Sequence, residues 1–135
     1  MLKLGIIRPS NSQYCSPVVL VKKSDDNYRL TVDFRTLNSI SVFDAEPACS
    51  MENDLHLFTG SVYFSELDLT KAYHQIPLSE RTKKLTAFAT SKGLMEFTSL
   101  PFGMVTACAT YARLMRIVVA GLRNVTLYFD NVSFI

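Results

Sequence analysis

The stretch that decides the fold is "VYFSELDLTKAYHQIPL", residues 62–78. Its first part, Val62 to Leu69, has the residue types of a strand and brings Asp68 close to the strand's end. A helical stretch through Ala72 and Tyr73 follows, and a proline then ends it. An acidic residue where a strand ends is a recurrent position for a functional site. Asp68 is therefore the first candidate site residue.

A second acidic residue lies in "LYFDNVSFI", residues 127–135. Aromatic and β-branched residues flank Asp130 and Asn131, which predicts a hairpin with these two as its turn. Asp and Asn are also ordinary turn residues, so a plain turn is the alternative. If this hairpin and the strand bearing Asp68 are neighbours in one sheet, the two carboxylates would face each other. Such an arrangement holds divalent cations for phosphoryl transfer.

The rest of the chain supplies two more hairpins and two helices. Residues 18–32 predict a hairpin with a basic tip, and residues 85–100 predict another around Ser91-Lys92-Gly93. A short helix is expected near residues 51–58, and a longer one carries a single apolar stripe. The stripe consists of Ala107, Tyr111, Leu114, Met115, Val118, Val119 and Leu122. This mixed order predicts an α+β domain rather than repeated βαβ units.

Length and composition bound the class of protein. The 135 residues are 48% apolar, enough for one domain with a core. The net charge of +2 does not by itself indicate a nucleic-acid partner. No apolar run is long enough to span a membrane and no signal peptide is recognisable, which favours an intracellular protein, cytoplasmic or nuclear. The three cysteines, Cys15, Cys49 and Cys108, fit neither a disulfide framework nor a zinc site and are expected to be reduced packing residues.

Four ordered blocks carry a family resemblance. They are "GIIRPSNSQYCSPVVLVKKSDDNYRLTVDFRTLN", "YFSELDLTKAYHQIPL", "TAFATSKGLMEFTSLPFG" and "LYFDNV". In order and spacing they resemble the reverse transcriptases of gypsy-type long-terminal-repeat retrotransposons. The resemblance implies a right-hand polymerase fold with an antiparallel palm sheet and packed helices. The chain would then be one reverse-transcriptase domain fragment: about 1–60 and 77–100 fingers-like, about 61–76 and 101–135 palm-like, with thumb, connection and RNase H absent.

The resemblance also implies a metal site. Asp68 matches the metal-binding aspartate of the first palm motif, and Asp130 matches the first aspartate of the family's Tyr-x-Asp-Asp hairpin. Leu69 matches a position whose backbone carbonyl also ligates metal. Two Mg²⁺ ions suit this set, with Mn²⁺ as an alternative, and the reaction implied is nucleotidyl transfer to a primer 3′-hydroxyl. Asp68, Asp130 and Asn131 are the candidate catalytic residues.

A second set of positions matches the family's nucleotide pocket. Lys23 and Arg29 match fingers residues that lie against the incoming triphosphate, where their charges neutralise phosphate oxygens. Tyr73 matches the bulky residue that excludes a ribose 2′-hydroxyl, and Phe102 and Gly103 match the motif lining the nucleotide pocket and template. For Tyr73 and Phe102 plain core packing is the alternative. The implied partners are an RNA or DNA template with its primer, deoxynucleoside triphosphates, and the remaining polyprotein domains of an intact element.

The chain departs from the family pattern at several positions. Asn131 stands in place of the second aspartate of the hairpin. At an effective dielectric near 20, a unit charge about 4 Å away contributes roughly 4 kcal/mol. Half of that corresponds to about 30-fold in rate. Further departures are Thr106 and Cys108 after Pro-Phe-Gly, and Glu46, Ala48 and Cys49 around Pro47.

Three interpretations follow. The first is a retroelement RNA-directed DNA polymerase domain, impaired by Asn131 and by truncation. The second is a catalytically inactive remnant or a co-opted module that binds nucleic acid or protein. The third is a chain without a stable fold, because an exposed sheet edge at Val132 to Ile135 would invite aggregation.

Overall fold

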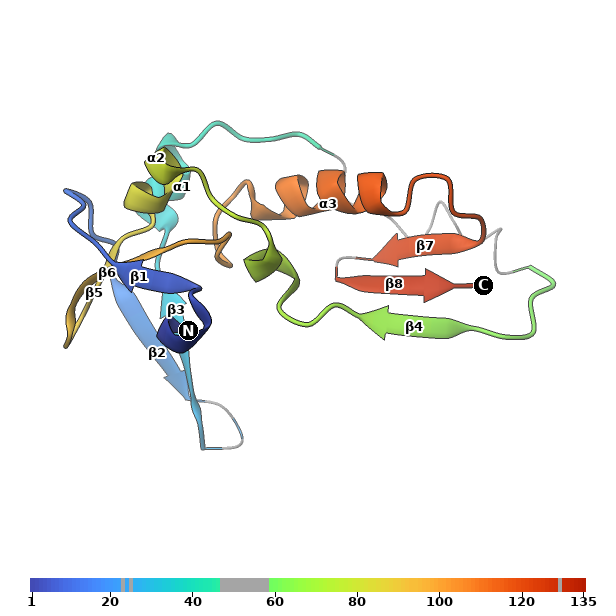
Figure 1. Cartoon of the computed structure of the whole chain (residues 1–135), viewed down its shortest axis with the longest axis horizontal. Helices are drawn as coiled ribbons and strands as arrows, with labels where there is room; N and C mark the ends of the chain where they lie inside the picture. Colours follow the sequence, from blue (N-terminus) through green and yellow to red (C-terminus); the bar gives the residue numbers. More distant parts are fainter. Residues whose placement is uncertain (23, 25, 47–58, 129) are drawn as a thin grey trace. The chain divides into compact units, whose positions relative to one another are not determined.

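The computed structural model describes residues 1–22, 24, 26–46, 59–128 and 130–135, and its elements are labelled in Figure 1. The chain divides into two compact units, each assembled from two separate segments. Unit 1 is Met1–Phe43 with Tyr73–Ala107, and unit 2 is Asp44–Ala72 with Cys108–Ile135. The helix expected near residues 51–58 lies outside the described residues.

Unit 1 contains a three-stranded sheet, a separate hairpin and short helices. In chain order these are η1 (Leu2–Leu4), β1 (Ile7–Pro9), β2 (Val18–Lys22), β3 (Tyr28–Val32), α1 (Arg35–Ile40), most of η3 (Ala72–Gln75), α2 (Glu80–Leu85), β5 (Phe88–Thr90) and β6 (Gly93–Phe97). Both hairpins predicted here are confirmed, because β2 pairs with β3 and β5 pairs with β6. The short helices α1 and α2 were not predicted, since six residues are too few for an apolar stripe to show.

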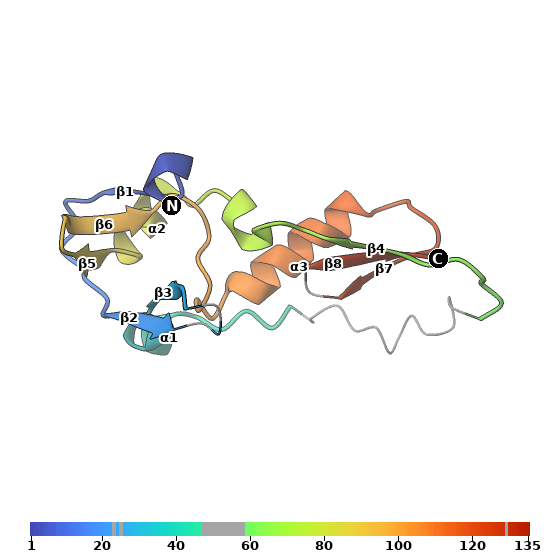
Figure 2. The same cartoon turned by 90° about the horizontal axis from the view of Figure 1, so that it is seen from below.

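The three-stranded sheet of unit 1 combines strands from both segments of the unit: β1 from the first, β5 and β6 from the second. Strand β6 lies between β1 and β5 and is antiparallel to both, as Figure 2 shows. A core of six buried side chains forms in this unit: Ile6, Val32, Phe34, Phe88, Met95 and Phe97. Residues 6–9 thus complete a sheet whose other strands begin about eighty positions later. Burial of these side chains stabilises the unit by roughly 25 cal/mol for each Å² of apolar surface removed from water.

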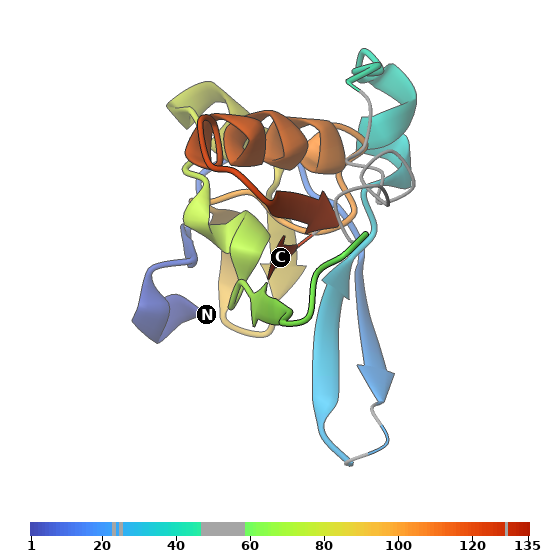
Figure 3. The same ribbon diagram turned by 90° about the vertical axis from the view of Figure 1, so that its right-hand side faces the viewer.

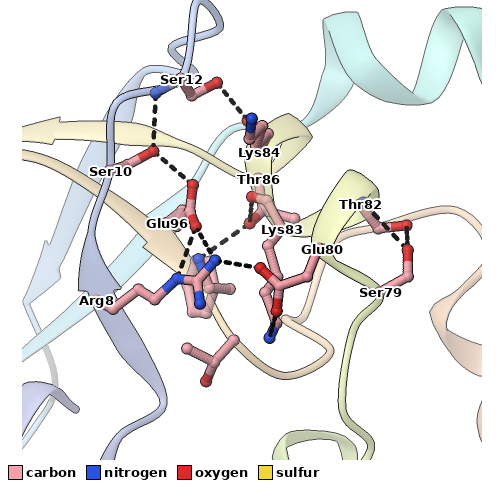
Figure 4. A network of polar contacts seen from close by, with 12 residues as sticks. Arg8, Ser10, Ser12, Ser79, Glu80, Thr82, Lys83, Lys84, Thr86 and Glu96 are labelled. Carbon is pink, nitrogen blue, oxygen red and sulfur yellow. Dashed lines mark hydrogen bonds and ion pairs between the residues drawn. The ribbon is translucent and has the colours of Figure 1, made fainter.

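A polar network fastens helix α2 to the sheet of unit 1 (Figure 4). The Glu96 side chain is only 4% exposed, and its carboxylate accepts hydrogen bonds from Arg8 Nε at 2.8 Å and from Ser10 Oγ at 2.5 Å. Arg8 also pairs with Glu80 on α2, and Glu80 pairs with Lys83, both at 2.6 Å. The buried carboxylate is therefore neutralised by a cation from the neighbouring strand, as a buried charge requires.

Unit 2 contains a three-stranded antiparallel sheet and the longest helix. Its elements are β4 (Ser65–Asp68), α3 (Ala107–Val118), β7 (Val125–Tyr128) and β8 (Asn131–Phe134), with Ala107 itself in unit 1. Figure 3 shows α3 lying over the strands of this sheet. From α3, Tyr111 and Met115 are buried, and Leu127 and Val132 are buried on β7 and β8. The fold is α+β, as expected.

The structure corrects the prediction of an exposed edge at Val132 to Ile135. The strand order is β4-β8-β7, so β8 is the central strand and is hydrogen-bonded on both sides. After β7 the chain enters β8, which lies between β7 and β4. The edge strands of the sheet are therefore β4 and β7. The argument for an unstable chain, which rested on that edge, was therefore wrong.

Three smaller predictions are also corrected. The strand bearing Asp68 begins at Ser65, and Val62 to Phe64 precede it in exposed positions. The apolar stripe on α3 is buried only in part, because Leu114, Val118 and Leu122 are exposed and the helix ends at Val118. Cys15 and Cys108 form no disulfide and are exposed rather than packed, while Cys49 lies outside the described residues.

Candidate active site

The register of two strands in unit 2 places Asp68 directly opposite Asn131. Asp68 is the last residue of β4 and Asn131 the first of β8, and the antiparallel register pairs them. Leu69 N–H donates to the Asp130 carbonyl at 3.0 Å, which makes the adjoining Asp68–Asn131 pair the non-hydrogen-bonded kind. Side chains of such a pair share one face and approach closely, with Cβ atoms about 4.5–5.5 Å apart.

The hairpin turn differs by one residue from the predicted one. Tyr128 pairs with Asn131, so Asn131 belongs to β8, whereas Asp130 lies in the turn. Asn131 therefore has a side-chain direction fixed by the pleat of the sheet, and it is half-buried. The prediction of an Asp130-Asn131 turn was wrong because Asp and Asn are both ordinary turn residues, so their types alone do not fix which residues form the turn.

The backbone turns after Asp68, and the Leu69 carbonyl is already engaged in that turn. The Leu69 carbonyl accepts a hydrogen bond from Ala72 N–H at 3.1 Å, which starts the η3 turn. Lys71 has a left-handed backbone with φ 53°, which is uncommon for a residue with a side chain. The chain thus turns directly after Asp68, at the end of β4.

The oxygen donors at this end of the sheet suit a hard cation. Asp68 and Asp130 offer carboxylates, Asn131 offers an amide oxygen, and Leu69 offers a carbonyl with one lone pair engaged. Oxygen ligands of this kind are what Mg²⁺ takes, usually with one or two carboxylates. Within the described ranges no cluster of three or more His, Cys, Asp or Glu side chains is present. The donor set fits the smaller, two-carboxylate kind of site.

A second group of predicted residues comes together in unit 1. The rings of Tyr73 and Phe102 lie with centroids 4.6 Å apart, and the Arg29 guanidinium lies over the Phe102 ring at 5.6 Å. This arrangement is a cation–π contact. Tyr73 is 6% exposed whereas Phe102 is 47% exposed. Phe102 therefore presents one part of its ring to solvent and is supported from behind by Tyr73.

His74 completes the support of this ring. Its imidazole meets Phe102 edge-on at 5.9 Å and stacks on Phe97 at 6.1 Å. Its Nδ1 lies 3.0 Å from the Leu100 carbonyl, which can only accept, so Nδ1 carries the hydrogen. The imidazole is thereby held in one orientation between the core and Phe102.

Asn38 on α1 is a residue that the sequence analysis missed. Its Nδ2 donates to the Gly103 carbonyl at 2.7 Å, and its Oδ1 accepts from Val105 N–H at 2.8 Å. Gly103 has φ 92°, and a Cβ there would meet Phe34 at 3.6 Å. An isolated asparagine in a short helix carries no pattern that predicts a contact more than sixty residues away.

The predicted site residues thus form two groups, one in each unit. Asp68, Leu69, Asp130 and Asn131 are together in unit 2, and Arg29, Tyr73, Phe102 and Gly103 are together in unit 1. Lys23 lies outside the described residues. Strands β2 and β3 place Arg29 opposite Val21, next to the tip of their hairpin.

Comparison with known proteins decides the family. The model of the family described as "Reverse transcriptase (RNA-dependent DNA polymerase)" matches residues 21–135. The chain belongs to the reverse transcriptase family. The predicted resemblance to gypsy-type retrotransposons is confirmed. The Pol polyprotein of the Drosophila melanogaster transposon 297 is 37% identical over 98% of this chain, and that of transposon gypsy is 41% identical over 84% of it.

Solved structures agree with this reverse transcriptase assignment. The native prototype foamy virus protease-reverse transcriptase matches 98% of this chain with a TM-score of 0.85 and 27% identity. A foamy viral protease-reverse transcriptase solved with an RNA/DNA hybrid matches 99% with a TM-score of 0.85 and 23% identity, which shows the fold alone. The chain spans 13% of the transposon 297 polyprotein and 18% of each of these two structures. Reverse transcriptases generally depend on divalent metal ions.

In the parts of this reverse transcriptase domain that the structure describes, no helix is long and apolar enough to cross a membrane. The homologous domains named above are parts of larger polyproteins.

Proposed function

We propose that this reverse transcriptase domain contributes the fingers and part of the palm of an RNA-directed DNA polymerase. The observation that supports the proposal best is the β4–β8 register, which brings Asp68 to the same end of one sheet as Asp130 and Asn131. The substrates would be deoxynucleoside triphosphates and a primer on an RNA or DNA template. In the reaction the primer 3′-oxygen bonds to the α-phosphorus and pyrophosphate leaves.

The carboxylates of Asp68 and Asp130, with the Leu69 carbonyl, would hold two Mg²⁺ ions, or Mn²⁺ in their place. Bound there, the cations would supply charge stabilisation at the attacking and leaving oxygens. Arg29 would donate to the triphosphate, and Lys23 would add a point charge. Phe102 and Gly103 would line the pocket, and the Tyr73 ring, packed on Phe102, would exclude a ribose 2′-hydroxyl.

A second candidate function is a module that binds nucleic acid without catalysis. Asn131 favours it, because the amide keeps an oxygen but loses the negative charge opposite Asp68. Fewer anionic ligands weaken the binding of a divalent cation. The two proposals differ in one measurable quantity, the rate of nucleotide addition.

The test joins residues 1–135 to the thumb and connection of a related polymerase and measures primer extension over a range of Mg²⁺ concentrations. We expect extension by the Asn131 form, and about 30-fold faster extension with a lower Mg²⁺ requirement in Asn131→Asp. The Asp68→Asn variant is the matched control and should be inactive. Duplex binding without extension in the Asn131 form, together with activity in Asn131→Asp, would favour the binding module.

A further inference from the structure

In unit 1, the side chain of Asn38 hydrogen-bonds twice to the backbone of the short loop Pro101–Val105. Asn38 donates to the Gly103 carbonyl at 2.7 Å and accepts from Val105 N–H at 2.8 Å. The amide thus pairs with two main-chain groups, the carbonyl of the residue before Met104 and the N–H of the residue after it. Two bonds fix the amide orientation, because its oxygen cannot donate and its nitrogen cannot accept.

Asn38 is itself held in place by its surroundings. Its backbone N–H donates to the Phe34 carbonyl at 2.7 Å, in the first turn of α1. Phe34 is 2% exposed and belongs to the core of unit 1. Asn38 is therefore bonded to the backbone of a residue whose side chain is packed in the core.

The loop that Asn38 holds carries the exposed ring of Phe102. That ring is contacted by Tyr73, His74 and Arg29 at 4.6, 5.9 and 5.6 Å, and none of these contacts fixes the backbone that follows it. Gly103, next in the chain, has φ 92° and has Phe34 within 3.6 Å of where a Cβ would stand. The direction in which Phe102 projects depends on how Gly103 is held, and Asn38 holds it.

We infer that Asn38 is a positioning residue that sets the orientation of Phe102 and Gly103 as the floor of the nucleotide pocket. The inference rests on the proposed polymerase function and adds to it a residue that contacts neither metal nor nucleotide. Misplacement of a binding surface by a fraction of an ångström is enough to weaken a bound substrate, since geometry decides how much of each contact is realised.

The experiment uses the 135-residue chain and two matched substitutions. Asn38→Asp has nearly the same shape, keeps the acceptor for Val105 N–H and loses the donor to the Gly103 carbonyl. Asn38→Ala loses both bonds. Asn11→Asp, the same chemical change at an exposed asparagine of unit 1, is the control. The readouts are amide exchange at Val105, the Kd for dATP with Mg²⁺, and the Kd for a primer–template duplex.

We expect faster exchange at Val105 in Asn38→Ala but not in Asn38→Asp. The Kd for dATP should rise in both variants by at least about 3- to 10-fold, the effect of losing one neutral hydrogen bond. The Kd for the duplex should rise by less, because duplex affinity comes mainly from many phosphate contacts. A merely structural role would raise both dissociation constants in parallel or prevent folding, and either result overturns the inference. If the unsubstituted chain binds dATP and the two Asn38 variants bind it with the same Kd, the inference is overturned but the proposed function is not. If the unsubstituted chain binds no dATP, the proposed function fails and the inference fails with it.

Discussion

At the scale of single residues, the pair Asp68–Asn131 holds the main chemical question of this reverse transcriptase domain. The two side chains share one face of the sheet at a non-hydrogen-bonded position. A carboxylate at Asn131 would lie opposite that of Asp68. Like charges directly opposite each other destabilise a sheet by roughly 0.2–1 kcal/mol, and a bound cation removes the repulsion. Asn131 therefore lowers the affinity for a cation, but it avoids the repulsion that a second carboxylate would cause in the absence of a cation.

The first prediction concerns the stability of Asn131→Asp in the 135-residue chain. Without Mg²⁺ we expect a lower melting temperature than in the unsubstituted chain, because two carboxylates then face each other. With millimolar Mg²⁺ we expect a rise in melting temperature that is larger for Asn131→Asp than for the unsubstituted chain. Calorimetry with and without Mg²⁺ checks both. Equal Mg²⁺ responses of the two proteins would show that Asn131 is not at a cation site.

A second prediction concerns Tyr73, whose ring is 6% exposed and packs on Phe102. In the fusion of residues 1–135 with a related thumb and connection, Tyr73→Ala should admit ribonucleotides more readily, because it removes the volume that would exclude a 2′-hydroxyl. It should also cost about 3–5 kcal/mol of stability, as large-to-small core substitutions do. Tyr73→Phe is the control, since it keeps the volume of the ring and should retain discrimination. Equal exclusion of ribonucleotides by all three proteins would reduce the role of Tyr73 to packing.

At the scale of elements, an ion pair between Glu80 and Arg8 joins helix α2 to its sheet. Ser79 caps the helix by accepting from Thr82 N–H, and Glu80 in the first turn faces the positive end of the helix. Lys83 and then Arg8, each hydrogen-bonded to Glu80, lower the pKa of its carboxyl from about 4.5 to about 2. The Glu80 side chain is 70% exposed, so its contribution to stability is modest.

The third prediction is a pH dependence that follows from this shift. Because the folded-state pKa of Glu80 lies below its unfolded value, its stabilisation is complete above about pH 4.5 and disappears as the pH falls through about 2. Glu80→Gln should therefore lower the urea midpoint at pH 7, and the gap to the unsubstituted chain should narrow between pH 4.5 and 2. Arg81→Gln, which alters an exposed charge on the same helix, is the control. A gap that stays constant down to pH 2 would contradict the assigned ion pairs.

At the scale of the whole molecule, each unit is built from segments far apart in the sequence. Unit 1 needs residues 6–9 to complete its sheet and its core, although the family match begins only at residue 21. Arg8 from this segment neutralises Glu96, whose side chain is 4% exposed. The folding unit thus extends about fifteen residues ahead of the family match.

The fourth prediction is that removing residues 1–12, which include β1 but leave β2 intact, unfolds unit 1. Losing Ile6 from the core costs about 2–5 kcal/mol, and leaving the Glu96 carboxylate without Arg8 costs about 3–5 kcal/mol. Their sum approaches the whole stability of a small domain. Amide exchange in β5 and β6 would report the loss, and removal of residues 1–4 alone is the control, because Leu2 and Leu4 are exposed. Retained protection in β5 and β6 would show that the sheet is stable without β1.

The sequence by itself determined the family, the α+β class and three hairpins, because motif spacing and the two-residue period of strands are local properties. It also singled out Asp68, Asp130 and Asn131, since their types and order are legible without a fold. The tertiary structure decided that β8 is the central strand and that Asn131, not Asp130, lies opposite Asp68. It alone disclosed Asn38 and the Arg8–Glu96 pair. Strand order and long-range hydrogen bonds depend on which segments pack together, and burial rather than any neighbouring residue sets that choice.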